Sequence, residues 1–245
     1  MNNQATLEKM KLLKLNGMYQ SFTNSIENGL TNDFTCDEMV AHLIDAECDD
    51  RHNRRISMLV KFAKFRYQAL IAEIKYSQER NLNKNQILRF SDLNWLKKGE
   101  NIVISGATGT GKSFLSCAIG NHVCMNGMKV LYNNSNKLFY DLKLSKTCGN
   151  YHKQIKSLLK KDLIIIDDFG LEILDKDSRM ILLEILEDRL EKKSIIITSQ
   201  LPVTNWYDVI GDKTIADAIC DRILSSSHRI ELSGESLRKI KNKSS

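Results

Sequence analysis

The chain has 245 residues, enough for one sizeable domain and a smaller one with buried cores. No run approaches the roughly eighteen apolar residues that span a membrane, and the first residues lack the charged-then-apolar pattern of an export signal. The six cysteines include no C-x-x-C pair, so the spacing of a disulfide framework or a zinc site is absent. We therefore expect a reduced, cytoplasmic protein with no membrane partner, whose thiols are small core residues.

The net charge of +6 is unevenly distributed along the chain. Residues 1–50 contain three basic and nine acidic residues, whereas residues 51–89 contain ten basic and two acidic ones. A block with that excess is typical of a protein that binds a polyanion. A solvated helix face has the same composition, so charge alone leaves both interpretations open.

Residues 1–80 predict a small all-helical domain. Apolar residues recur at helical spacing over residues 7–26, close to one helical stripe. Residues 35–38 form a capping box that opens a second helix. A third, basic helix is expected from about Arg54 to Ser77, followed by a polar linker at 81–85.

Residues 81–245 predict a second domain, in which strands alternate with helices. The apolar runs in it do not alternate with polar residues, as is typical of strands covered on both faces. This pattern indicates an α/β fold with a five-stranded parallel sheet. The candidate strands are residues 101–105, 129–133, 163–167, 194–198 and 228–232.

A complete phosphate-binding loop of the form G-x-x-x-x-G-K-[ST] follows the first of these strands and precedes a helix. Its glycines allow backbone N–H groups to converge on one point, beside the positive end of the helix. Lys112 is expected to reach the outer phosphates of a nucleotide, and the Ser113 hydroxyl to ligate Mg²⁺. The expected nucleotide-binding residues are Gly106, Ala107, Thr108, Gly109, Thr110, Gly111, Lys112, Ser113 and Phe114.

Two acids and a polar strand tip follow at the same predicted edge of the sheet. The strand at 163–167 ends in Asp167, followed by Asp168. We expect Asp167 to hold Mg²⁺, directly or through water, and Asp168 to polarise the attacking water as a general base. The tip at 198–200 ends in Gln200, which is placed to hydrogen-bond the γ-phosphate or the lytic water. A strand-end turn before Pro202 is the other interpretation of this tip.

The order of motifs resembles the IstB-like AAA+ ATPases, the ATP-binding helper proteins encoded beside the transposase in a group of bacterial insertion sequences. DnaC-type helicase loaders are close relatives. The resemblance covers most of the chain and is carried by the phosphate loop together with residues 165–170, 197–202, 206–212, 216–222 and 228–236.

The resemblance implies a P-loop AAA+ core that binds and hydrolyses ATP with Mg²⁺. It also implies a homo-oligomer on DNA with active sites shared between subunits, and a cognate transposase as partner. By motif position, residues 198–200 hold the first sensor and Arg222 is an arginine finger that completes a neighbour's site; Arg238 is a candidate second sensor. Taken by itself, Arg222 has a surface ion pair as its other interpretation. The sequence departs from the family pattern in having Asp168 where many relatives have Glu, and in ending before a full C-terminal lid.

Two clusters of basic residues are candidates for DNA binding. No helix-turn-helix or zinc-finger pattern is present, so contact with the phosphate backbone and little base readout are expected. The clusters comprise Arg51, Arg54, Arg55, Lys61, Lys64 and Arg66, and Lys137, Lys143, Lys146, Lys153 and Lys156.

Four functions remain open from the sequence. The first is a DNA-stimulated ATPase that assists a transposase. The second is a DnaC-like loader of a replicative helicase, which would use the same motor with another partner. A small-molecule P-loop kinase and a nucleotide-gated scaffold without useful turnover are the others.

Overall fold

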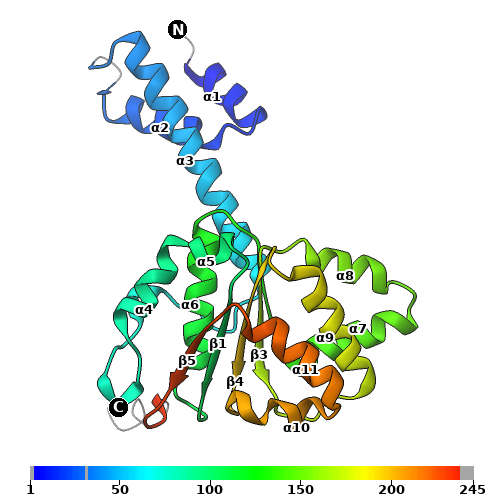
Figure 1. Ribbon diagram of the computed structural model, residues 1–245. Helices are drawn as coiled ribbons and strands as arrows, with labels where there is room; N and C mark the ends of the chain where they lie inside the picture. The colour runs from blue at the N-terminus through cyan, green and yellow to red at the C-terminus, as the bar shows by residue number, and fades with distance from the viewer. Residues whose placement is uncertain (1–2, 31–32, 238–245) are drawn as a thin grey trace. The chain divides into compact units, whose positions relative to one another are not determined.

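The computed structural model describes residues 3–30 and 33–237 of the chain. They fall into two compact units, an N-terminal unit that ends at Met58 and an α/β unit that begins at Leu59 (Figure 1). Over the described ranges, no helix has both the length and the apolar character needed to cross a bilayer.

The N-terminal unit begins with two short helices where the apolar spacing predicts a single one. They are α1 (Asn3–Leu12) and α2 (Asn16–Glu27), and Lys14 between them has a φ of 58°. The Glu47 carboxylate accepts hydrogen bonds from the N–H groups of Gly17 at 2.8 Å and Met18 at 3.2 Å. The first turn of α2 is thus capped by a residue distant in the sequence, which local periodicity cannot detect.

The third helix, α3 (Cys36–Ala63), begins at the predicted capping box. The Thr35 N–H donates to Glu38 Oε2 at 2.8 Å, and the Glu38 N–H donates to Thr35 Oγ1 at 3.3 Å. Two free donors at the helix start are satisfied in this way, which confirms the prediction.

α3 continues through the region where the sequence predicts a break between two helices. Residues 45–54 contain no glycine or proline. Two ion pairs with one-turn spacing support the helix there, Arg51 with Glu47 and Arg54 with Asp50. The helix ends at Ala63, and Lys64 has a φ of 58°. The predicted extension to Ser77 is therefore wrong.

Residues 64–97, which belong to the α/β unit, form turns and short helices that pack against its sheet and α6. Ala69, Ile74 and Leu82 are buried in the same cluster as Ile102 of the sheet. The compact units consequently divide after Met58, whereas the linker pattern suggests a boundary after residue 80. The short helices are η2 (Ile71–Glu73), η3 (Gln78–Arg80), α4 (Lys84–Arg89), η4 (Phe90–Asp92) and α5 (Asn94–Lys97).

A five-stranded parallel sheet forms the centre of the α/β unit, in the order β2-β3-β4-β1-β5. All the predicted strands are present, with ends that differ by one or two residues. They are β1 (Asn101–Gly106), β2 (Val130–Asn134), β3 (Leu163–Phe169), β4 (Ser194–Ser199) and β5 (Ser227–Leu232). Because neighbouring strands are parallel, their carboxyl ends meet at one edge of the sheet.

Helices cover both faces of the sheet (Figure 1). Side chains alternate between two buried clusters: Ile102 and Ile104 face one, and Val103 faces the other. α6 (Lys112–Met125) packs in the first cluster with the 64–97 segment. The second cluster contains α7 (Ser135–Thr147), α8 (Tyr151–Leu159), α9 (Lys176–Arg189), α10 (Trp206–Ile210) and α11 (Lys213–Leu224).

The described chain ends at Leu237, shortly after β5, and the described residues include no helical lid. The parallel sheet with its helices and the helical region before it confirm the predicted α/β architecture. The cysteines divide differently from the prediction. Cys117, Cys124 and Cys220 are buried, whereas Cys36, Cys48 and Cys148 are exposed.

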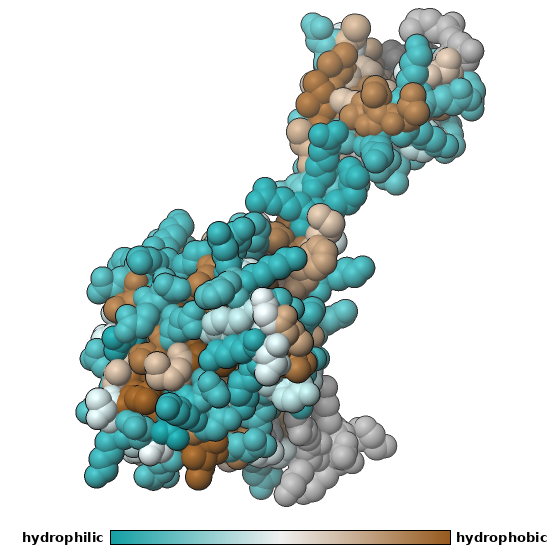
Figure 2. Space-filling view, turned by 90° about the vertical axis from the view of Figure 1, so that its right-hand side faces the viewer, coloured by the Kyte–Doolittle hydropathy of each residue, from teal (hydrophilic) through white to brown (hydrophobic). Residues whose placement is uncertain are grey.

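Exposed apolar side chains occur in both units, between the polar residues that cover much of the face seen in Figure 2. Those in the N-terminal unit are Leu12, Leu13, Leu30, Val40, Ile44 and Met58.

Candidate active site

The phosphate loop connects β1 to α6 at the carboxyl edge of the sheet, as the motif requires. Gly106, Gly109 and Gly111 have φ values of 143°, 85° and 96°. A Cβ at Gly106 would lie 2.2 Å from the Leu232 carbonyl oxygen, and one at Gly109 would lie 2.1 Å from Ser236 Oγ. The loop conformation therefore needs glycine at these positions.

Lys112 and Thr110 hold the loop in shape from within. Lys112 Nζ donates to the carbonyl oxygens of Gly106 at 2.7 Å and Ala107 at 2.9 Å. Thr110 Oγ1 also donates to the Ala107 carbonyl, at 2.8 Å. Gly111 precedes α6, and no side chain caps the first turn of this helix. The start of a helix favours negative charge, so the position suits an anion.

A buried arginine from the preceding segment supports the outside of the loop. Arg80 is 8% exposed, and its Nη2 donates to the Thr110 carbonyl at 2.9 Å. Its backbone carbonyl accepts from the Ser233 N–H at 3.2 Å, which ties the segment to the residues after β5. Arg80 was not among the predicted site residues, because nothing in the local sequence distinguishes it.

Asp167, the first acid at the end of β3, is fully buried. The Thr198 hydroxyl donates to its Oδ1 and the Tyr132 hydroxyl to its Oδ2. Arg66 Nη1 lies 3.6 Å from the same Oδ2. Burial, together with the hydrogen bond to Asp167, raises the pKa of Tyr132 far above its usual value. The phenol therefore stays a proton donor, and the carboxylate has three donors around it.

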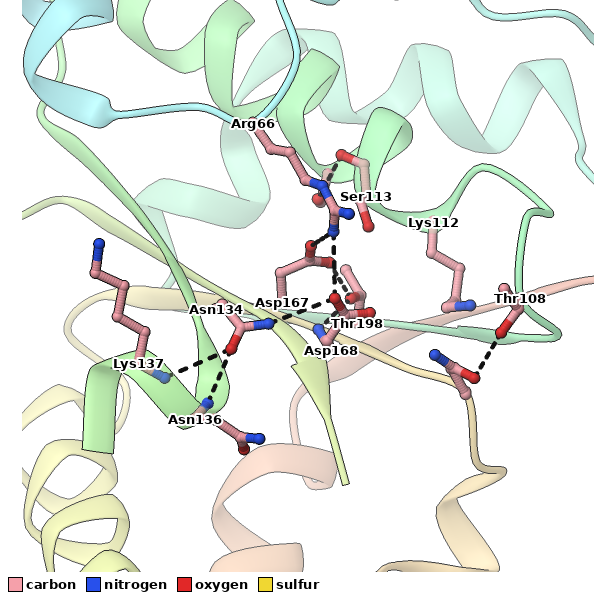
Figure 3. Close-up of polar contacts among 12 residues, drawn as sticks. Arg66, Thr108, Lys112, Ser113, Asn134, Asn136, Lys137, Asp167, Asp168 and Thr198 are labelled. Carbon is pink, nitrogen blue, oxygen red and sulfur yellow. Dashed lines mark hydrogen bonds and ion pairs between the residues drawn. The ribbon is translucent and has the colours of Figure 1, made fainter. Parts of the chain in front are cut away.

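Asp168 differs from its neighbour in conformation and exposure. It has a φ of 59° and lies where the register between β3 and β4 shifts, so its side chain leaves the regular strand. The side chain is 18% exposed and contacts Asn134 Nδ2 at 3.4 Å and Arg66 Nη1 at 3.3 Å. Its N–H donates to Thr198 Oγ1 at 3.1 Å. One threonine hydroxyl thus bonds to both acids (Figure 3).

The tip of β4 reaches the phosphate loop. Thr108 Oγ1 donates to Gln200 Oε1 at 2.6 Å (Figure 3). Phe114 is partly buried at the start of α6, with its ring centroid 6.4 Å from that of Tyr67. The structure therefore brings together the loop, Asp167, Asp168 and Gln200 at one edge of the sheet.

The phosphate loop and the acid pair lie in a chain that matches one family model over most of its length. A model of the family described as IstB-like ATP binding protein matches residues 8–245. The chain belongs to this family.

Relatives of this IstB-like chain are named for insertion sequences. The insertion sequence ATP-binding protein y4pL of Sinorhizobium fredii is 40% identical over 240 residues, which cover 98% of each chain. The ATP-binding protein of insertion sequence IS21 from Pseudomonas aeruginosa is 24% identical over 226 residues, covering 92% of this chain and 85% of the relative.

Solved structures share the fold of this IstB-like chain at low identity. The DnaC helicase loader matches with a TM-score of 0.58 and 20% identity, over 68% of this chain and 98% of DnaC. The replication initiator DnaA, bound to AMPPCP and single-stranded DNA, matches with a TM-score of 0.61 and 18% identity, over 74% of this chain and 55% of DnaA. The α/β unit therefore has the AAA+ fold.

Arg222 of the IstB-like chain lies far from its own phosphate loop. It is on α11, where Nη1 donates to the Ala218 carbonyl at 2.8 Å and Nη2 pairs with Glu187. Its carbonyl accepts from Asn101 Nδ2 at 3.3 Å, and Asn101 begins β1, at the end opposite to the loop. Arg222 is thus absent from the residues that meet at the site within one chain.

The predicted DNA-binding residues have varied surroundings. Four of them form ion pairs: Arg51 with Glu47, Arg54 with Asp50, Lys143 with Asp175, and Lys146 with Asp177. The Lys143 ammonium and the capping contacts of Ser178 lower the pKa of Asp175 to about 2. Arg55, Lys61, Lys64 and Lys137 have exposed side chains, and Lys153 and Lys156 are exposed on α8.

Arg66 and Arg238 are two further residues to which the sequence assigned a role. Arg66, grouped with the basic cluster in the sequence, lies at the acid pair instead. Arg238 lies outside the described residues. Tyr132 and Asn134 at the site were not predicted, although both lie near the carboxyl end of a strand, where such side chains can be sought.

Proposed function

We propose that this protein is a Mg²⁺-dependent ATPase that assists the transposase of an insertion sequence. The observation that supports it best is the convergence of the phosphate loop and the acid pair on one edge of the sheet. Both are bonded to the end of β4, the loop through Thr108 and Gln200 and the acids through Thr198. In this proposal Lys112 turns from the loop carbonyls to the outer phosphates of ATP. The N–H groups of the loop and of α6 bind the remaining phosphate oxygens.

The residues at the site fit a magnesium ion. Mg²⁺ prefers hard oxygen ligands, keeps several waters and is bound with substrate phosphates. Ser113 supplies a hydroxyl and Asp167 a carboxylate. Both Asp167 oxygens already accept hydrogen bonds, so contact through water fits them best. When bound, the ion would neutralise charge on the phosphates.

Asp168 is the proposed general base. Its carboxylate is partly exposed, whereas that of Asp167 is fully buried, so water reaches Asp168 more readily. The bond from its N–H to Thr198 fixes its backbone. In hydrolysis, the attacking water would pass a proton to the Asp168 carboxylate as its oxygen bonds to the γ-phosphorus. The bond between the γ-phosphorus and the β–γ bridging oxygen would break at the same time, and ADP would leave with that oxygen. Gln200, beside the loop, would orient that water or the γ-phosphate.

Arg222 is proposed to act on the site of a neighbouring subunit. Its distance from its own loop agrees with action in trans. A guanidinium supplied to the γ-phosphate in this way contributes about 10³–10⁵ in rate where it operates. Mixing Arg222→Ala subunits with Lys112→Ala subunits would then restore part of the ATPase rate at mixed interfaces. Additive, inactive mixtures would contradict the assignment.

The names of the relatives support DNA and a transposase as partners. These relatives are named as ATP-binding proteins of insertion sequences, which supports the proposal that a transposase is the partner. The exposed apolar residues of the N-terminal unit are the proposed surface for it. The exposed basic residues, Arg55, Lys61, Lys64 and Lys137 among them, are proposed to contact DNA phosphates. The similarity to DnaC concerns the fold, so loading of a helicase is not proposed.

The proposal is tested by the ATPase rate with Mg²⁺ or EDTA, with and without duplex DNA. We expect turnover only with Mg²⁺ and a clear increase with DNA. DNA affinity should fall with salt, with a log–log slope of about −0.9 for each phosphate contacted. A slope near zero would contradict binding to the DNA phosphates. Nucleotide binding without turnover would favour the nucleotide-gated scaffold over the ATPase. Pull-down with the proposed transposase partner tests that part of the proposal.

A further inference from the structure

One cation of this chain lies at the acid pair itself. Arg66 Nη1 is 3.3 Å from Asp168 Oδ2 and 3.6 Å from Asp167 Oδ2 (Figure 3). Asp167 is fully buried, so its charge has little water around it. A guanidinium at this distance therefore neutralises much of the local negative charge.

Arg66 is placed by backbone that packs firmly on α6. A Cβ at Gly120 of α6 would lie 2.7 Å from the Phe65 ring, so ring and helix are in close contact. Asn121 Nδ2 donates to the Ala69 carbonyl at 2.9 Å, which fixes the segment on the other side of Arg66. The backbone of residues 65–69 is thus held against the helix that begins with Lys112.

The Arg66 side chain itself is less confined. It is 43% exposed, and its guanidinium carbon lies 5.6 Å from the centroid of the Tyr67 ring. The head group can therefore leave the carboxylates for solvent or for the ring face without unpacking the core. The Arg66 backbone is thus fixed, whereas its guanidinium can move away from the two carboxylates. A side chain with these properties can give up its place at the carboxylates to another cation.

We propose that Arg66 is the counter-ion of Asp167 and Asp168 before nucleotide binds, and that Mg²⁺ entering with ATP displaces it. Resting on the proposed function, this makes Arg66 a positioning residue that sets the Mg²⁺ requirement. An ion held through water at the Asp167 carboxylate would come close to the guanidinium that now faces this carboxylate, and a positive charge close to a divalent ion weakens its binding. The arginine keeps the two acids in place until the ion arrives.

The experiment measures the Mg²⁺ concentration that half-saturates binding of a fluorescent, non-hydrolysable ATP analogue. Arg66→Gln should lower that concentration by about five- to tenfold, because a competing charge is removed. Arg66→Lys keeps the charge and should stay close to the wild type. Arg89→Gln, which removes an exposed arginine on α4, is the matched control and should change nothing.

Thermal melting gives a second readout that does not depend on activity. Without Mg²⁺, Arg66→Gln should melt below the wild type, since the two carboxylates then repel each other. Adding Mg²⁺ with the analogue should raise its melting temperature by more than that of the wild type. If Arg66 had a purely structural role, Arg66→Gln would lower the melting temperature by the same amount without Mg²⁺ and with Mg²⁺ and the analogue.

The contrary outcomes are distinct. An unchanged or higher Mg²⁺ requirement in Arg66→Gln would overturn the exchange. Selective loss of the triphosphate analogue relative to ADP would instead make Arg66 a phosphate contact. If the wild type binds no nucleotide with or without Mg²⁺, the proposed function fails, and the exchange with it.

Discussion

The phosphate loop and the acid pair face each other at one edge of the sheet, but they are held in different ways. Contacts within the loop join residues close in the sequence, such as Lys112 with Gly106 and Thr110 with Ala107. The acid pair is surrounded by Arg66, Tyr132 and Thr198, which come from three separate parts of the chain. The contacts inside the loop therefore come from a local motif, with Arg80 and Gln200 bonding to it from outside, whereas every contact of the acid pair named here comes from a distant part of the chain.

The largest expected effect on nucleotide binding lies in the loop. Lys112→Ala removes the ammonium that we assign to the phosphates, and truncating one partner of a buried charge pair costs about 2–5 kcal/mol. Nucleotide affinity should fall by roughly 30-fold to several-thousandfold. Titration with a fluorescent ATP analogue measures it. Because Lys112 also donates to two carbonyls of the loop, the melting temperature without nucleotide is measured beside the affinity. A folded variant with normal affinity would show that Lys112 does not contact the nucleotide.

The acid pair should separate binding from turnover. Asp168→Asn keeps the size of the side chain and should retain ATP affinity, but it loses the proposed base, whose contribution is about 10²–10⁴ in rate. Single-turnover hydrolysis beside an equilibrium binding measurement tests this. Undiminished hydrolysis in Asp168→Asn would show that Asp168 is not the general base. A loss of ATP affinity as large as the loss of rate would show that the acid pair also contributes to binding.

A smaller effect should follow from the hydroxyl that joins the two acids. Thr198→Val keeps the shape but leaves a buried carboxylate oxygen and the Asp168 N–H without this partner, a cost of about 1–3 kcal/mol in unfolding free energy. Urea unfolding measures it. The matched control is Thr204→Val, whose hydroxyl bonds only to the neighbouring Asn205 side chain at an exposed position, with an expected change within about 0.5 kcal/mol. Equal effects of the two substitutions would contradict the role of Thr198.

The smallest effect tests the route from the core to Arg66. Gly120→Ala places a methyl 2.7 Å from the Phe65 ring and from Ile165 Cδ1, and such overpacking costs about 1–3 kcal/mol. Better helix propensity returns about 1 kcal/mol. We expect a net loss of about 1 kcal/mol, with a shifted Mg²⁺ requirement. Stability lost with an unchanged Mg²⁺ requirement would show that Phe65 does not position Arg66.

The same contrast explains what could be predicted from the sequence. The strands, the phosphate loop and Asp167 with Asp168 were predicted, because apolar runs, glycines and strand-end acids are local patterns. The break between α1 and α2 was not, since Glu47 caps α2 from another helix. Arg66 resembled one more basic residue in a charged block. Only packing against α6 turns it toward the carboxylates.

The position of Arg80 has a practical consequence for anyone who wishes to produce the α/β unit alone. A fragment cut at the polar linker would begin after Arg80 and discard the guanidinium that binds the Thr110 carbonyl, together with the Arg66 side chain at the acids. A fragment that starts at Leu59 keeps both. The shortest piece of this chain suited to nucleotide studies is therefore longer than its phosphate loop and strands alone would suggest.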